Sequence, residues 1–111
     1  MAAFAIGWVA IGPALATSGY DYHERTFNSC LYWVSASFDT SSPNGSASGG
    51  DLGCASWRFL NAYFWNGSSF VNFSCQCASI IYPYYTVNVY GYSQIQKPLG
   101  SWSPTIEAHA Y

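Results

Sequence analysis

The chain has 111 residues, of which 7% are charged and 20% are aromatic, and its formal net charge at pH 7 is −2. Its three basic residues, Arg25, Arg58 and Lys97, are too few for a surface that tracks nucleic-acid phosphates, so composition argues against a nucleic-acid partner. Because 50% of the residues are apolar, composition also argues against disorder, and we expect a single folded domain over residues 1–111.

Residues 1–16 are apolar and alternate in the way a strand does, with Phe4, Ile6 and Trp8 on one face. The segment ends in Ala14-Leu15-Ala16, which resembles a signal-peptidase site, but it lacks a basic leader and contains glycine and proline. It is also shorter than the ~18 apolar residues that a membrane span requires. We therefore expect an N-terminal strand and no membrane span, with a residual signal segment as the alternative.

The densest cluster of ionisable side chains follows this segment and comprises Asp21, Tyr22, His23, Glu24 and Arg25. In a strand, the aspartate, the histidine and the arginine would share one face, as general acid–base chemistry can require. The simpler interpretation is that these charges cap a turn after Gly19 and keep one loop soluble. Glu107 and His109 are also two positions apart, but no nucleophile, phosphate-loop or metal motif accompanies either group. We therefore expect no catalytic residue.

The stretch Cys30–Phe38 has the period-two alternation of a strand with one buried face. Residues 39–53 are rich in serine and glycine and carry the turn signal Asn44-Gly45, so we expect a long flexible loop there. Asp39 and Asp51 bracket this loop, and carboxylates are the ligands that calcium prefers. A solvated loop is the simpler interpretation, so we predict no metal and no other cofactor.

Two β-rich runs flank Asn66-Gly67, which is the pattern of a type I′ hairpin turn. With these two residues as the turn, Trp65 faces Ser68 and Tyr63 faces Phe70. The core side of this hairpin then carries the aliphatic residues and two cysteines. The other side interleaves rings with amides and hydroxyls: Trp57, Phe59, Asn61, Tyr63, Trp65, Phe70, Asn72, Ser74 and Gln76. A register slip of one residue would exchange the two sides.

The stretch Tyr84–Ile95 places tyrosines and amides where a soluble protein usually places lysine and glutamate. Read with a period of two, its buried face is Tyr85, Val87, Val89, Gly91, Ser93 and Ile95. Its opposite face is Tyr84, Thr86, Asn88, Tyr90, Tyr92 and Gln94. Such a face is polar enough for water but carries no charge, so it suits a neutral partner. Burial of both faces under other elements is the alternative.

The chain has four cysteines, Cys30, Cys54, Cys75 and Cys77. No Cys-x-x-Cys pair typical of a zinc site is present, so we expect disulfides and therefore an oxidising compartment. In a strand, Cys75 and Cys77 would have Cα atoms about 6.5–7 Å apart, at the limit for a disulfide. We therefore expect Cys30–Cys75 with Cys54–Cys77, or Cys30–Cys77 with Cys54–Cys75. Four free thiols in a reduced protein are the alternative.

A break at Tyr82-Pro83 and a loop with Pro98, Gly100 and Pro104 precede a closing strand over Thr105–Tyr111. Six or seven short strands without helical periodicity predict an all-β fold, a small disulfide-stapled antiparallel β-sandwich or a partly open barrel. Asn-x-Ser glycosylation patterns, which arise by chance in a chain rich in these residues, begin at Asn44, Asn66 and Asn72.

Rings interleaved with amides and hydroxyls match the apolar face and the hydroxyls of a sugar. We therefore expect a secreted or cell-surface module that binds a neutral carbohydrate or a similar uncharged surface. The expected ligand-binding residues are Tyr84, Asn88, Tyr90, Tyr92, Gln94, Trp57, Asn61, Tyr63 and Trp65. An uncharged aromatic patch is also an association site. Self-assembly into an extracellular filament, sheath or coat, with the N-terminal strand pairing to another copy of the chain, is therefore the alternative. A small secreted hydrolase ranks third.

Overall fold

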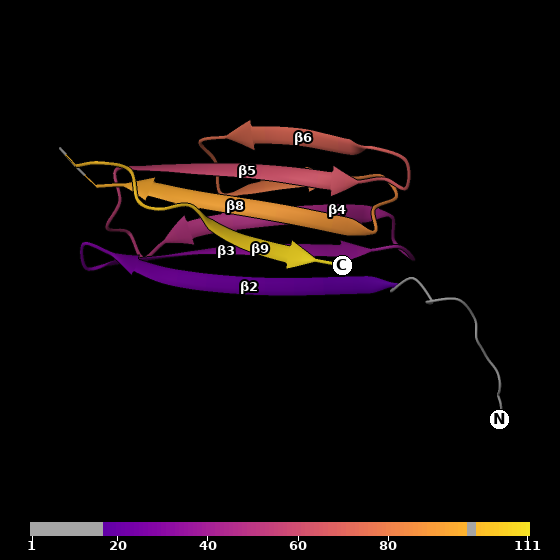
Figure 1. The fold of residues 1–111 in the computed structure, drawn as a ribbon, viewed down its shortest axis with the longest axis horizontal. Coiled ribbons are helices and arrows are strands. Elements are labelled where there is room, and N and C mark those ends of the chain that lie inside the picture. The colour runs from indigo at the N-terminus through magenta and orange to yellow at the C-terminus, as the bar shows by residue number, and fades with distance from the viewer. Residues whose placement is uncertain (1–16, 98–99) are drawn as a thin grey trace, which may run out of the picture.

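Eight β-strands make up the part of the chain that the structure, a computed structural model, describes: residues 17–97 and 100–111 (Figure 1). The strands are β2 (Ser18–Phe27), β3 (Cys30–Asp39), β4 (Asn44–Asp51), β5 (Trp57–Trp65), β6 (Phe70–Cys75), β7 (Ser79–Tyr82), β8 (Asn88–Gln96) and β9 (Ile106–Ala110). The strand predicted over residues 1–16 lies outside the described residues. Within the described ranges, no helix is long and apolar enough to cross a membrane.

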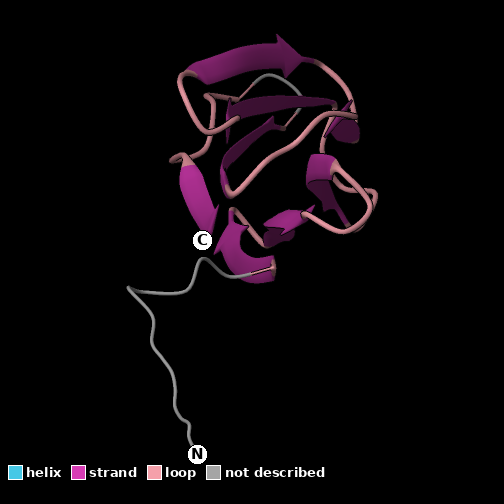
Figure 2. Cartoon of the chain, turned by 90° about the vertical axis from the view of Figure 1, so that its right-hand side faces the viewer, coloured by secondary structure: helices cyan, strands magenta, loops and turns pink. Residues whose placement is uncertain are grey.

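The strands form two antiparallel sheets of four strands, which enclose the core between them (Figure 2). One sheet has the order β2-β3-β4-β7 and the other has the order β6-β5-β8-β9. The chain crosses from one sheet to the other after β4, after β6 and after β7, and β9 lies beside β2 at one side of the sandwich (Figure 1). The predicted all-β, disulfide-stapled sandwich is confirmed. The described residues alone exceed the predicted six or seven strands, because β2, β4 and β7 were not foreseen.

The core lies between the inward faces of β3, β5, β8 and β9. Along β3 the buried and half-buried residues alternate without exception, so the predicted period-two alternation is confirmed, and Tyr32, Val34, Ala36 and Phe38 form the buried face. The two sheets approach closely at Gly91 of β8. A Cβ atom at that position would lie 3.1 Å from a backbone oxygen of β3, so a small residue is required there.

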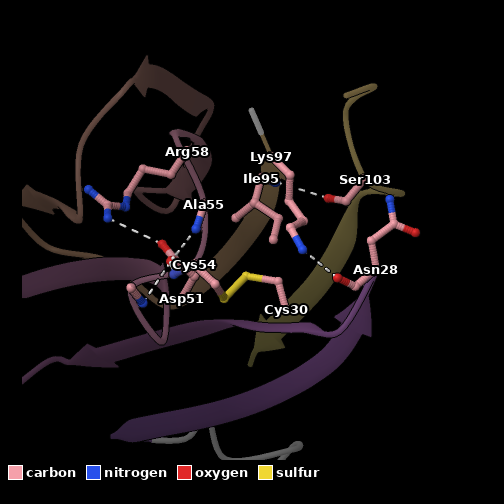
Figure 3. The surroundings of a disulfide bond; sticks show 10 residues. Asn28, Cys30, Asp51, Cys54, Ala55, Arg58, Ile95, Lys97 and Ser103 are labelled. Carbon is pink, nitrogen blue, oxygen red and sulfur yellow. Dashed lines mark hydrogen bonds and ion pairs between the residues drawn. A yellow bond between two sulfur atoms is a disulfide. The ribbon is translucent and has the colours of Figure 1, made fainter. Parts of the chain in front are cut away.

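The β2–β3 hairpin contains a two-residue turn at Asn28-Ser29. Both residues have positive φ angles, 49° and 64°, and Phe27 pairs directly with Cys30. Two consecutive positive φ angles are the requirement of a type I′ turn. Lys97 Nζ donates a hydrogen bond of 2.7 Å to the carbonyl oxygen of Asn28, which ties this turn to the end of β8 (Figure 3). The type I′ turn is therefore here and not at Asn66-Gly67, where it was predicted.

The predicted flexible loop over residues 39–53 is wrong, because β4 occupies its middle. β4 pairs with β3 from the Asp39–Asn44 pair to the Tyr32–Asp51 pair. The true turn spans residues 40–43, where Asp39 Oδ1 accepts a hydrogen bond of 2.9 Å from the backbone N–H of Ser41. The turn signal Asn44-Gly45 thus falls inside the strand rather than at its boundary.

β4 has glycine at position 45 because the residues packed against it leave no room for a side chain there. A Cβ atom on Gly45 would lie 2.8 Å from Phe64 Cδ1 and 2.9 Å from Thr86 Cγ2. On the outer face, Ser46 Oγ and Ser37 Oγ lie 2.7 Å apart and join β4 to β3. Glycine and serine have low strand propensity, so a strand built from them resembles a loop in the sequence.

The β5–β6 hairpin has the predicted strands but a register that differs by two residues. Trp65 pairs with Phe70 rather than with Ser68, and the other predicted pairs shift equally. The loop has four residues instead of two, because Asn66 Oδ1 accepts hydrogen bonds of 3.0 Å from the backbone N–H groups of Ser68 and Ser69. A shift by an even number keeps each side chain on its predicted side. On the edge strand β6, however, Phe73 of the predicted core side stays 43% exposed.

Strand β8 begins at Asn88, four residues later than predicted. Within β8 the predicted faces are confirmed, since Val89, Gly91, Ser93 and Ile95 are buried. Before β8 the chain is crossing between the sheets, and the predicted faces are wrong for Tyr85 and Thr86. Tyr85 is 44% exposed, whereas Thr86 is buried with its hydroxyl bonded to the carbonyl oxygen of Tyr84 at 2.9 Å.

Both predicted disulfide pairings are wrong: the bonds are Cys30–Cys54 and Cys75–Cys77. The prediction excluded Cys75–Cys77 on the spacing of an extended strand. β6 ends at Cys75, and the chain then bends, which brings the two Cα atoms to 5.2 Å. The Cys30–Cys54 bond joins the start of β3 to the crossover between β4 and β5 (Figure 3). No described cysteine is free.

Asp51 organises the crossover that carries Cys54. Its Oδ2 accepts hydrogen bonds from the backbone N–H groups of Gly53, Cys54 and Ala55 at 2.9, 2.9 and 3.0 Å (Figure 3). Its Oδ1 lies 3.2 Å from Arg58 Nη2, and the carboxylate is fully buried. Burial acts to raise the pKa of Asp51, but these hydrogen bonds together outweigh it and lower the pKa. Asp51 is therefore a charged structural residue.

Candidate functional site

The outer face of β5 and β8 carries five successive cross-strand pairs, which we call the ring–amide face. The pairs are Trp57–Gln96, Phe59–Gln94, Asn61–Tyr92, Tyr63–Tyr90 and Trp65–Asn88. Four of these five rows place an aromatic ring opposite an amide. Side chains paired across neighbouring antiparallel strands point to the same side, so each row presents both groups together.

The middle three rows line an open hollow with a volume of about 590 Å³. Phe70 of β6 and a residue preceding β9 complete its lining: Phe59, Asn61, Tyr63, Phe70, Tyr90, Tyr92, Gln94 and Thr105. A volume of this size lies within the usual range for small-molecule sites. Among the described residues, none that lines the hollow carries a charge at neutral pH.

Phe70 fills the ring–amide face at its Trp65 end. Its ring centroid lies 4.9 Å from that of Trp65, 5.9 Å from that of Tyr90 and 6.3 Å from that of Tyr63. Tyr63 in turn meets Tyr92 edge to face, with centroids 6.0 Å apart and planes at 90°. Such contacts fix the ring orientations without the help of a ligand.

On the β9 side, His109 supports the tyrosines of β8. Its ring lies flat against Tyr90, with centroids 3.8 Å apart and planes at 12°. Its Nε2 lies 2.7 Å from Asn88 Oδ1, and Tyr111 stacks on its other side at 4.4 Å. Tyr90 and Tyr92 are parallel within 3°. His109 therefore supports Tyr90 from the neighbouring strand, and the parallel rings of Tyr90 and Tyr92 line the β8 side of the hollow.

Two amides of the hollow are oriented by hydrogen bonds to residues outside it. Asn61 Oδ1 accepts a hydrogen bond of 2.7 Å from Asn72 Nδ2, so the N–H groups of Asn61 are what it offers to a ligand. Gln94 Nε2 donates a hydrogen bond of 3.1 Å to the carbonyl oxygen of Ser103, so its Oε1 is the atom that it offers. The hollow therefore presents an oriented donor and an oriented acceptor.

Ser103 also positions Thr105 at the hollow, because it attaches this part of the chain to β8. The backbone N–H of Ile95 donates to Ser103 Oγ at 2.9 Å, and the backbone N–H of Ser103 donates to the carbonyl oxygen of Ile95 at 2.8 Å. These bonds hold the segment after residue 100 against the end of β8. Tyr32 reinforces the segment by donating its hydroxyl hydrogen to the carbonyl oxygen of Pro104.

Burial raises the pKa of Tyr92, and the nearby carboxylate of Glu107 adds to the shift. Glu107 pairs with Tyr92 across β8 and β9, so it borders the ring–amide face from the outside of the hollow. A raised pKa keeps the Tyr92 hydroxyl protonated throughout the neutral range, where it can both donate and accept a hydrogen bond.

Of the nine predicted ligand-binding residues, the hollow contains five: Asn61, Tyr63, Tyr90, Tyr92 and Gln94. Trp57, Trp65 and Asn88 lie on the same face but at its ends. Tyr84 is not part of the face, because it lies in the crossover before β8, where it contacts Tyr82.

Three residues of the hollow were not predicted as ligand-binding residues. Phe59 and Phe70 were assigned to the correct side of the hairpin. The pairing of Phe59 with Gln94 and of Phe70 with Trp65 was the signal that could have added them to the predicted ligand-binding residues. Thr105 has no signal in the sequence, because it depends on the return of the chain through Ser103.

The predicted acidic and basic cluster does not cap a turn, because it lies within β2. Asp21 Oδ2 lies 3.1 Å from His23 Nε2 and accepts a hydrogen bond of 2.9 Å from the backbone N–H of His109. The hydrogen bond from His109 is the main cause that lowers the pKa of Asp21, and His23 adds to it. Asp21 thus links the two sheets.

The two aspartates that bracket residues 39–53 lie at opposite ends of the β3–β4 hairpin, so they cannot share an ion. Metal-ligating atoms of Cys30, Asp51 and Cys54 do lie within 4.8 Å of one another. Their two sulfurs form a disulfide, and Asp51 is engaged by three backbone N–H groups and Arg58. This cluster is therefore structural.

No protein-family description, curated protein or solved structure shows a detectable match to this chain. The site alone must therefore support an inference about function.

Proposed function

We propose that the protein is a secreted or surface-exposed binding module that holds a neutral carbohydrate in the hollow of the ring–amide face. The observation that carries this proposal is the uncharged lining of the hollow, in which aromatic rings alternate with amides that are already oriented. Orientation before binding reduces the entropy that a ligand must overcome.

The chemistry of the lining matches the two surfaces of a sugar ring. The C–H face of a pyranose is apolar and packs on flat aromatic rings, which Tyr63, Phe70 and Tyr92 supply. Sugar hydroxyls both donate and accept, and the hollow offers a donor at Asn61 and an acceptor at Gln94. A charged ligand would lose its hydration without gaining a countercharge in the hollow.

Binding without chemical conversion is the activity that this site supports best. The predicted acid–base cluster does not line the hollow, because Asp21 is engaged by His109 and His23 at the junction of β2 and β9. Two disulfides fit an oxidising compartment, and an extracellular location is part of the proposal.

A glycan array followed by titration calorimetry on the retained glycan tests the proposal. Tyr92→Ala removes a wall of the hollow and is expected to weaken binding by about tenfold or more. Two matched controls are Tyr20→Ala, on β2 of the other sheet, and Tyr84→Ala, in the crossover before β8; these side chains are 69% and 63% exposed. Both controls should bind like the parent protein. Retention of no neutral glycan, or equal loss in all three variants, would refute the proposal.

Self-assembly is a second candidate, and the edge strand β6 is the observation that favours it. Within the described residues, β6 pairs on one side only and carries no charged or proline residue, the usual protection of an edge. Phe70 and Phe73 on this strand are 48% and 43% exposed. Sedimentation at micromolar concentration distinguishes the two functions: a concentration-independent monomer argues against assembly, whereas ordered polymers dissolved only by denaturant argue against a carbohydrate-binding module.

A further inference from the structure

The ring–amide face is longer than the hollow, and its rows repeat. Successive rows are two residues apart along β5 and β8, which corresponds to about 6.7 Å. Trp57–Gln96 is the row that follows Phe59–Gln94, beyond the hollow. Trp57 is 54% exposed, so its ring is accessible.

The two ends of the face are not equivalent. At the Trp65 end, Phe70 contacts Trp65, Tyr63 and Tyr90 and thereby fills the face. At the Trp57 end, the pair Trp57–Gln96 continues the same alternation of ring and amide. Among the described residues, β6 begins to pair with β5 only at Leu60, so no residue of β6 lies beside Trp57 in the sheet. The accessible stretch therefore runs from Tyr63–Tyr90 to Trp57–Gln96.

We propose that the ligand is a linear neutral polysaccharide that lies along β5 and β8, with one end of its bound stretch at Phe70 and the rest extending past Trp57. This inference rests on the proposed carbohydrate-binding function. The four accessible rows span about 20 Å, and their spacing is of the same order as one sugar unit in an extended chain. A periodic set of ring and amide pairs recognises a periodic ligand better than a single sugar in the hollow, which would leave the Trp57–Gln96 row without a contact.

In the outermost row, the amide of Gln96 is oriented by a hydrogen bond, as the amides of the hollow are. Its Nε2 donates a hydrogen bond of 2.8 Å to the carbonyl oxygen of Gly100, which leaves its Oε1 as the atom available to a ligand. Gln94 is oriented in the same way by Ser103. Two successive glutamines on β8 therefore present acceptors to successive units of one chain, opposite Phe59 and Trp57.

The experiment measures affinity against chain length. β-1,4-linked glucose and mannose oligomers, each from one to about six units, are titrated calorimetrically into the parent protein, Trp57→Ala, Tyr92→Ala and the control Tyr20→Ala. Affinity should rise with length until the chain reaches Trp57. Trp57→Ala should lower the affinity for the longest oligomers by about tenfold and leave the shortest unchanged, because only long chains reach that ring. Tyr92→Ala should weaken binding at every length.

Two results overturn the inference in distinguishable ways. If an oligomer binds but its affinity does not depend on length, or if Trp57→Ala behaves like Tyr20→Ala for the longest chains, the site recognises a single sugar and the proposed function stands. If neither ladder binds and no neutral glycan is retained on the array, both the inference and the proposed function are wrong. Circular dichroism and thermal unfolding of each variant confirm that a lost affinity is not lost folding.

Discussion

The backbone N–H of His109 donates a hydrogen bond of 2.9 Å to the side chain of Asp21, which lies 88 positions earlier in the chain. The bond joins β9, an edge of one sheet, to β2, an edge of the other (Figure 1). His109 also stacks on Tyr90 of the ring–amide face. The carboxylate of Asp21 therefore joins the two sheets and also holds the residue that supports Tyr90 in the proposed binding site.

Asp21→Asn should lower the free energy of unfolding at pH 7 by about 1 kcal/mol, because the charge-assisted hydrogen bond becomes a neutral one. The pKa of Asp21 is lowered in the folded protein, so its contribution is present above the unfolded value of 3.8 and is lost as the pH falls through the folded pKa. Urea unfolding between about pH 5 and about pH 1 should show the parent and the variant converging in stability. Glu24→Gln, on the outer face of the same strand, is the control. A constant difference across this range would contradict the assignment.

Asp51→Ala should destabilise the fold by about 3 kcal/mol, because three backbone N–H groups of the crossover lose their acceptor. Arg58→Ala should cost about 1 kcal/mol, since the Arg58 side chain is 43% exposed and its loss leaves the backbone hydrogen bonds of Asp51 in place. Denaturant unfolding of both variants under oxidising conditions measures the two values. If Arg58→Ala lowered the free energy of unfolding more than Asp51→Ala does, the main contribution of Asp51 would be the ion pair with Arg58 and not its hydrogen bonds to the crossover.

The two disulfides should differ in their effect on stability, because they close loops of very different length. Cys30 and Cys54 are 24 positions apart, whereas Cys75 and Cys77 are two apart. In the chain-entropy description, replacing Cys30 and Cys54 together with alanine costs about 3 kcal/mol, and replacing Cys75 and Cys77 costs clearly less. Thermal unfolding of the two double variants compares them, and equal losses would contradict this account.

The sequence predicts the parts of the fold that depend on period-two burial. β3 and β8 have one face of core residues each. The alternation of β3 was predicted, and the inward and outward sides of β8 were assigned correctly. The ring–amide face was also foreseen, because the register error in the β5–β6 hairpin was even and left every side chain on its side. A turn that is longer by two residues changes which residues pair across the two strands, but each side chain stays on the same face of the sheet.

What could not be predicted depends on contacts between segments distant in sequence. β4 has glycine at position 45 because Phe64 and Thr86 occupy the space of a side chain, and neither neighbour is evident from the sequence of β4 itself. The Cys75–Cys77 bond requires knowing that β6 ends at Cys75. Thr105 enters the hollow only through Ser103.

Gly45→Ala should destabilise the protein by about 1–3 kcal/mol, because the added methyl group overlaps Phe64 and Thr86 in the core. Ser48→Ala, at an outward position of the same strand, is the matched control and should change stability little. Chemical denaturation of both variants tests whether β4 is packed against the second sheet. A flexible loop at these positions would tolerate both substitutions equally.

Asn72→Ala should weaken binding of the retained glycan about threefold although Asn72 does not line the hollow, because Asn72 orients Asn61 through the 2.7 Å hydrogen bond between their amides. Asn61→Ala should weaken binding about tenfold, since it removes the donor itself. The double variant should bind no worse than Asn61→Ala alone, because orientation is irrelevant once the oriented group is absent. Additive losses would show that Asn72 acts on the ligand independently of Asn61, and the double-mutant cycle by calorimetry separates the two roles.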